Sequence, residues 1–226
     1  MIFPIGDDNI QGGHKPNLSY FLIVINVAIF IYQITTKSLK ELDLFYLEFG
    51  VIPMEISGGI DLFTLMTSMF LHGDLFHLAG NMLFLWIFAD NIEAVLGTAL
   101  FGLYYIVGGL FASLVHIYID PASTIPTIGA SGAISAVLGS YLVMFPKSRI
   151  KIIFILLFRR RFYISALVFL GLWFGQQVLS VMGSNPEGDT GGTAWWVHIG
   201  GFIYGVILGF ILKATYEGRY TYTVRT

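Results

Sequence analysis

The stretch Ile128-Gly129-Ala130-Ser131-Gly132-Ala133 opens an apolar segment that ends near Phe145. As an α-helix, residues 129–145 would be about 25 Å long, which is short for a bilayer core of about 30 Å. We therefore expect this helix to start below one membrane surface, with Ser131 in its first turn. A serine between glycines is by itself a weak signal, because a serine in a membrane helix commonly hydrogen-bonds its own backbone.

The composition indicates a membrane protein rather than a soluble domain. Of the 226 residues, 56% are hydrophobic and only 12% are charged, whereas a soluble domain carries about 25% charged residues. The net charge of −2 provides no basic footprint for nucleic acid. The chain has no cysteine, which excludes disulfides, thiolate metal sites and a cysteine nucleophile. Neither a metal nor another cofactor is expected, and no pattern specifies an oligomeric state.

Six apolar segments predict an all-α fold, a polytopic membrane protein with a bundle of six transmembrane helices. They cover residues 18–35, 75–96, 98–119, 129–145, 163–182 and 194–212. The six-helix domain then extends over residues 18–213, between a short disordered tail (1–17) and a polar tail (214–226). The less hydrophobic segments 36–70 and 147–161 are expected to lie in the membrane interface.

Basic residues set the expected orientation of the bundle. Both termini lie on one side, together with ten of the twelve Lys and Arg residues, whereas Lys37 and Lys40 lie on the other. This asymmetry places both termini in the cytoplasm and Ser131 near the outer face. No cleavable signal or targeting presequence is evident before residue 18, which favours the plasma membrane as the location.

Few polar side chains fall within the apolar segments, and four of them could carry chemistry. His77 and Asn81 are four residues apart and share one helix face. Ser131 becomes a nucleophile only if a base within about 3 Å takes its proton, and a histidine such as His198 is the usual base. His77, Asn81 and the backbone N–H of Ser131 could stabilise the oxyanion of acyl transfer. No acidic residue lies at this depth, which predicts a Ser131–His198 dyad.

Small residues recur every fourth position on the segments that carry Ser131 and His198. They are Gly132, Ala136 and Ser140 in the first segment, and Gly201, Gly205 and Gly209 in the second. Small residues at this spacing let two membrane helices approach closely, and such packing would carry His198 toward Ser131. The remaining polar residues have structural interpretations: His116 is expected to be satisfied locally, and Gln176 and Gln177 to bond across helices or face the outer polar layer.

Four motifs in this order resemble those of the rhomboid family of intramembrane serine proteases, over most of residues 18–213. They are His72-x4-His77-x3-Asn81, Asn91-x-Glu93-x2-Leu96-Gly97, Gly129-Ala130-Ser131-Gly132-Ala133 and Ala194-Trp195-Trp196-Val197-His198-Ile199-Gly200-Gly201-x3-Gly205. The resemblance implies a six-helix rhomboid bundle and a serine endopeptidase. Its partners would be the lipid bilayer and transmembrane protein substrates, cut within or near the outer end of a helix.

The resemblance also assigns roles to residues. Ser131 would be the nucleophile and His198 the general base, while His77, Asn81 and Gly129 would line the oxyanion hole with the Ser131 amide. Residues 120–128 would dip into the membrane. The fifth span and the loop 183–193 would be the mobile gate and cap.

Two alternatives and one departure accompany this interpretation. A catalytically inactive rhomboid-like factor would bind membrane proteins without cutting them, but Ser131 and His198 are both present. A small transporter would need inverted repeats and polar residues through the midplane, which the sequence lacks. Some family members stack an aromatic side chain, four residues after the serine, against the histidine; Ser135 occupies that position here. Another group must therefore orient His198.

Overall fold

A computed structural model describes residues 2–8, 10–11, 13–154, 161–183, 195–216 and 221–222. Its helices are α1 (Asn17–Thr36), α2 (Leu39–Phe49), α3 (Pro53–Ser57), α4 (Thr64–Thr67), the 3-10 turn η1 (Ser68–Phe70), α5 (Leu75–Phe84), the π-helical η2 (Leu85–Ala89), α6 (Asp90–Leu96), α7 (Thr98–Ile119), α8 (Ser131–Met144), α9 (Ala166–Gly183) and α10 (Trp195–Tyr216). Its strands are β1 (Ile2–Gly6), β2 (Ile10–Gln11), β3 (Arg149–Phe154), β4 (Arg161–Ser165) and β5 (Thr221–Tyr222).

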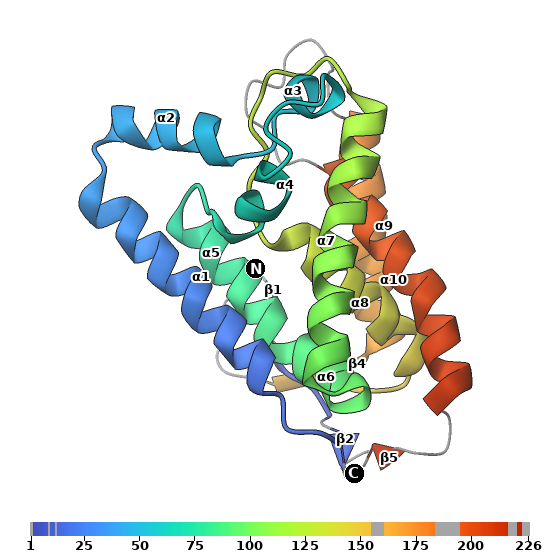
Figure 1. Ribbon diagram of the computed structural model, residues 1–226. Helices are drawn as coiled ribbons and strands as arrows, with labels where there is room; N and C mark the ends of the chain where they lie inside the picture. The colour runs from blue at the N-terminus through green and yellow to red at the C-terminus, as the bar shows by residue number, and fades with distance from the viewer. Residues whose placement is uncertain are drawn as a thin grey trace.

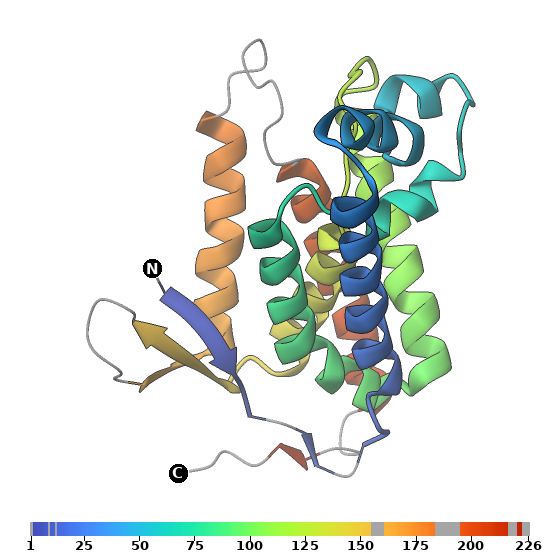
Figure 2. The same cartoon turned by 90° about the vertical axis from the view of Figure 1, so that its left-hand side faces the viewer.

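The predicted all-α, polytopic bundle is confirmed. Within the described residues, five helical stretches are long and apolar enough to cross a membrane: α1, the continuous run α5–η2–α6, α7, α9 and α10. The shorter apolar helix α8 lies among them at the centre of the bundle (Figures 1 and 2). Every residue of α8 from Gly132 to Tyr141 is buried, as expected for a helix that is apolar on all sides.

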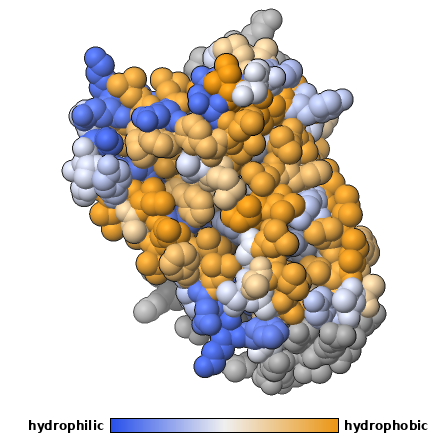
Figure 3. Space-filling view, in the orientation of Figure 1, coloured by the Kyte–Doolittle hydropathy of each residue, from blue (hydrophilic) through white to orange (hydrophobic). Residues whose placement is uncertain are grey.

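The surface of the bundle suits a lipid environment. Figure 3 shows apolar residues over most of the visible face, with hydrophilic residues gathered toward its two ends. Large exposed side chains of this surface include Phe21, Val24, Leu103, Leu114, Leu172 and Phe210. In water such a surface would be costly to expose, whereas in a bilayer the lipid tails solvate it.

The start of α8 lies inside the bundle rather than at its end. Figure 1 shows the chain descending from the end of α7, past α4, before α8 begins. Backbone hydrogen bonds fix this descent: Thr127 exchanges two with Val51, and the Gly129 N–H donates to the Ser68 carbonyl O at 2.9 Å. The short segment predicted around Ser131 is therefore a short helix of 14 residues.

The helix α1 is capped by a distant side chain. The buried Glu93 carboxylate of α6 accepts from the backbone N–H groups of Leu18 and Ser19 at 2.9 and 2.7 Å, and from the Ser19 hydroxyl at 2.6 Å. A carboxylate is favourable there because the first N–H groups of a helix lack partners and carry partial positive charge. Glu93 thereby joins the first two spans at one end.

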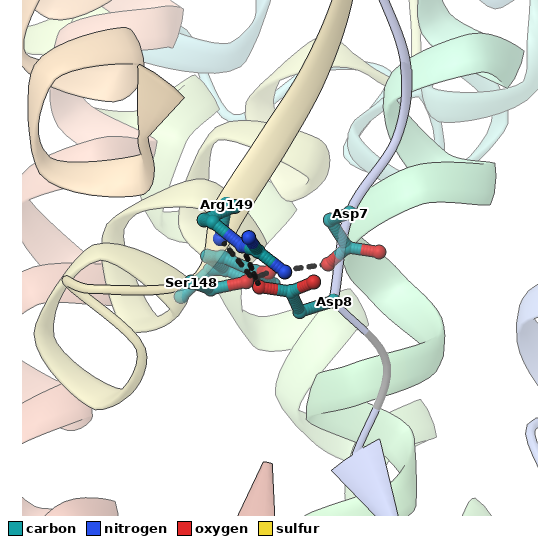
Figure 4. A network of polar contacts seen from close by, with 5 residues as sticks. Asp7, Asp8, Ser148 and Arg149 are labelled. Atoms are coloured by element: carbon teal, nitrogen blue, oxygen red, sulfur yellow. Dashed lines mark hydrogen bonds and ion pairs between the residues drawn. The ribbon is translucent and has the colours of Figure 1, made fainter. Parts of the chain in front are cut away.

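The N-terminal tail is ordered over much of its length, so the prediction of disorder for residues 1–17 is wrong. Strand β1 pairs antiparallel with β3, and β2 pairs with β5. Figure 4 shows a second contact that holds the tail in place. The Asp8 carboxylate accepts from the Arg149 backbone N–H at 3.0 Å and forms an ion pair with the Arg149 side chain at 3.2 Å. The prediction used only the local composition of residues 1–17, whereas the strands that pair with this tail lie more than a hundred residues away in the sequence.

The basic segment 147–161 was predicted to lie in the membrane interface, with no strand expected in it, but the structure shows paired β-strands here. Strands β3 and β4 pair antiparallel, with Ile150 opposite Ile164, and residues 155–160 lie outside the described part. Ile150 and Ile152 are buried while Lys151 is partly exposed, which is the alternation of a strand. Consequently α9 begins at Ala166 and not at Tyr163, which belongs to β4.

Helices α8 and α10 pack in the register predicted from their small residues. A Cβ atom placed on Gly201 would overlap the carbonyl O of Gly132, and one on Gly205 would overlap that of Ala136. One turn further, a Cβ on Gly209 would lie 2.9 Å from the Ser140 Cα. Because no side chain separates the two backbones, dispersion contacts and close approach hold the pair together in lipid.

Candidate active site

The side chains of His77 and Asn81 converge on the backbone just before α8. Both lie on the first turns of α5, which Asp74 caps by accepting from the Phe76 and His77 N–H groups. A Cβ on Gly129 would be 2.8 Å from His77 Nε2 and 3.6 Å from Asn81 Nδ2, and Gly129 has a φ of +125°. Only glycine fits this position, since a side chain would be both strained and obstructed.

Ser131 is the first residue of α8 and is half-buried beside this cluster. The first N–H groups of a helix have no partner within it, so the Ser131 amide can donate to a bound oxygen. His77, Asn81 and the Ser131 N–H, which the sequence analysis expects to line an oxyanion hole, thus lie around the Gly129–Ser131 backbone.

His72 is a supporting residue to which the sequence had given no role. Its Nε2 atom lies 3.0 Å from Asn81 Nδ2, and its backbone carbonyl accepts from Gln33 Nε2 at 3.2 Å and the Tyr46 hydroxyl at 3.1 Å. Burial, with a smaller effect of His77, lowers the pKa of His72 to about 3. His72 is therefore neutral, and its Nε2 lone pair accepts one Asn81 N–H while leaving the other free.

Ser131 and His198 lie on the facing first turns of α8 and α10. A Cβ on Gly132 would contact Val197 Cγ1 at 2.7 Å, and Gly201, one turn beyond His198, abuts Gly132. His77 of α5 is also close enough to act electrostatically on His198. Within the described residues no direct hydrogen bond joins the Ser131 hydroxyl to His198; the His198 side chain hydrogen-bonds Gln177 instead.

His198 is oriented by residues that the sequence did not assign to it. Its Nδ1 atom lies 2.8 Å from Gln177 Oε1 of α9. The rings of Trp173 and Trp195 each lie 6.0 Å from the imidazole, centroid to centroid, at interplanar angles of 37° and 80°. Gln177 was expected either to bond across helices or to face the outer polar layer, and it bonds across helices.

Ser135 does not contribute to holding His198. Its hydroxyl donates to the Ser131 carbonyl O at 2.7 Å, one turn back along α8. His116 has a local partner, as expected, because its Nε2 lies 3.2 Å from the Thr127 hydroxyl. Of the predicted cap, residues 183–193, all but Gly183 lie outside the described residues. The described residues of the chain hold no cluster of three or more potential metal-ligating side chains.

The chain is similar in sequence to known proteins of yeast, bacteria and mammals. The mitochondrial Rhomboid protein 1 of Saccharomyces cerevisiae is 28% identical over 90% of this chain and 56% of its own length. Rhomboid protease GluP of Bacillus subtilis is 28% identical over 86% of this chain and 35% of its own. The human presenilin-associated rhomboid-like protein, mitochondrial, is 37% identical over 42% of this chain and 25% of its own. The chain thus spans little more than half of the yeast relative.

These relatives contradict the predicted plasma-membrane location. The yeast and human proteins are both mitochondrial by name, which points to a mitochondrial membrane instead. The plasma membrane had been favoured by the absence of a presequence, a weak criterion because it depends on where the sequence begins. The family model of the Rhomboid domain matches residues 60–215, which include α5, α8 and α10 with all the residues of the site. The chain therefore belongs to the rhomboid family.

Proposed function

We propose that this protein is an intramembrane serine endopeptidase, with Ser131 as nucleophile and His198 as general base. The observation that carries the proposal is the packing of α8 on α10, which sets Ser131 and His198 on facing first turns beside His77 and Asn81. Four polar side chains gathered at one depth of an apolar bundle are costly to keep in a membrane and indicate a functional site.

The first half of the reaction forms an acyl-enzyme. The Ser131 Oγ attacks the carbonyl carbon of the scissile peptide bond while its proton moves to His198 Nε2. Negative charge develops on the carbonyl oxygen, where His77, the free Asn81 N–H and the Ser131 amide donate hydrogen bonds. The C–N bond then breaks, and the leaving amine takes the proton from His198.

The second half releases the acid product. His198 takes a proton from a water molecule, whose oxygen attacks the ester carbonyl, and then returns the proton to Ser131 Oγ as the ester bond breaks. Because Ser131 begins its helix part-way down the bundle, water meets it from the end of the bundle that carries α3 and the loop 120–128 (Figure 1). Catalytic hydrogen bonds often tighten only when substrate binds, so we expect Ser131 and His198 to come into hydrogen-bond contact in the complex with substrate.

The substrates would be membrane proteins whose transmembrane segment reaches Ser131 from the lipid. The apolar outer surface of the bundle confines such encounters to the bilayer. The mitochondrial names of the yeast and human relatives support a mitochondrial membrane as the location. One rhomboid relative is named as a protease, which supports the reaction class.

The experiment is cleavage of a reporter with one transmembrane helix by the purified full chain in liposomes. Ser131→Ala and His198→Ala should abolish cleavage while circular dichroism and gel filtration remain those of the wild type. Ser113→Ala is the matched control, because Ser113 is a buried serine of the neighbouring α7, and it should cleave normally. Cleavage retained by either active-site variant would refute the proposal.

A further inference from the structure

A histidine that acts as general base must present a bare nitrogen to its serine. Neutral imidazole has two tautomers, and the hydrogen bond made by one ring nitrogen decides which nitrogen keeps its lone pair. In Ser-His-Asp triads a buried carboxylate makes that bond and also fixes the ring. The described residues near His198 include no carboxylate within hydrogen-bond distance, so a different group must fix its ring and its tautomer.

The amide of Gln177 has only one orientation compatible with its neighbours. Its Nε2 group donates to the Trp173 carbonyl O at 3.1 Å. That carbonyl can only accept, so the Gln177 Oε1 atom must be the one that faces His198 Nδ1 at 2.8 Å. An amide oxygen can likewise only accept, and the proton of neutral His198 therefore lies on Nδ1. The lone pair is left on Nε2.

We propose that Gln177 is a positioning residue that holds His198 in the tautomer a general base requires, in the place of an acidic third member. The inference rests on the proposed function, since it concerns the base of that reaction. Gln177 fixes the imidazole by its hydrogen bond, while Trp173 and Trp195 confine the ring plane. This arrangement supplies the orientation that Ser135 cannot give.

A neutral acceptor suits the surroundings of this site. Gln177 is 3% exposed and is the buried polar residue of α9, whose other buried residues are Ala166 and Leu170. An ionised carboxylate would be expensive at such a position unless paired. Both ends of the Gln177 amide are paired, so it carries out the orienting role without a buried charge.

The adjacent glutamine provides a matched control. Gln176 precedes Gln177 on the same helix but is exposed. We expect Gln177→Met, which keeps the length but removes the acceptor, to slow fluorophosphonate labelling of Ser131 and to lower kcat by about 10–100-fold, with KM unchanged. Gln176→Met should react at the wild-type rate. Labelling of Gln177→Met at the wild-type rate would overturn the inference.

A second variant separates orientation from simple packing. Gln177→Glu restores an acceptor, so it should label faster than Gln177→Met. Its carboxylate also favours the imidazolium, which should move the acidic limb of the labelling–pH profile to higher pH. The other titratable side chain that acts on His198 is His77 of α5, and it is the same in all variants.

The outcomes distinguish the two proposals. If Gln177 had a purely structural role, Gln177→Glu would label no faster than Gln177→Met; that result would overturn the inference, whereas the proposed protease function would stand. Wild-type protein that fails to label at Ser131 would overturn the proposed function and the inference with it.

Discussion

Replacing Gly205 by alanine tests whether the close packing of α8 and α10 sets the catalytic geometry. Gly205 lies two turns below His198 on α10, directly against the backbone of α8. A Cβ atom there would overlap the Ala136 carbonyl O and lie 2.7 Å from its carbonyl carbon. The obstacle is backbone, so no change of rotamer can relieve it.

The expected losses of stability and activity in Gly205→Ala follow from these contacts. Carbon atoms pack best at about 3.5 Å, whereas Gly205→Ala would impose 2.7 Å to the Ala136 carbonyl carbon and a still shorter contact to its oxygen. The helices must therefore separate locally by roughly 0.8 Å or more. Overpacking costs about 1–3 kcal/mol, and the better helix propensity of alanine returns about 1 kcal/mol. Stability should therefore fall by at most about 2 kcal/mol. A displacement near 1 Å can cost about 100-fold in rate, so activity should fall much further than stability.

The assay compares the rate of reporter cleavage with thermal unfolding in the same detergent. Gly171→Ala is the control, because no atom lies within 4 Å of the Cβ position of that α9 glycine; it should keep full activity and unfold at the same or a higher temperature. A Gly205→Ala enzyme that cleaves at the wild-type rate would refute the reasoning, since the packing would then not position the site.

Two further predictions concern Asn81 and Asp7. Asn81→Ala should lower kcat by about 100- to 1000-fold through loss of an oxyanion donor, and an unchanged rate would remove Asn81 from the hole. Burial raises the pKa of Asp7 from 3.8 to about 8, although Tyr141 and Asn91 donate to it. The folded state then retains a proton that the unfolded chain loses, so wild-type stability relative to Asp7→Asn should fall as pH rises from about 4 to about 8, and level off above. Parallel curves of melting temperature against pH for the two proteins would contradict this.

The sequence was informative about the bundle because each of its signals is local. Apolar length located the spans, and the small residues Gly201, Gly205 and Gly209 predicted the packing face of α10, whose partners on α8 the structure confirms. The depth of Ser131 followed from the short segment that it begins. These features depend on residues within a few turns of one another.

The features that the sequence did not reveal depend on distant partners. Glu93 caps α1 from more than seventy residues away, and β1 pairs with β3, which lies more than a hundred residues further along the chain. Gln177 could not be paired with His198 by spacing, because the two lie on different helices joined by a segment without a regular pattern. Such contacts are set by how helices meet, which no single window of sequence encodes.

The central claim is that Ser131 is a nucleophile activated by His198. The most direct measurement is the site of covalent modification after wild-type protein in liposomes is treated with a serine-directed fluorophosphonate, located by mass spectrometry of peptides. The account predicts modification at Ser131 in the wild type and none in His198→Ala. Modification at another residue, or undiminished modification of Ser131 in His198→Ala, would contradict it.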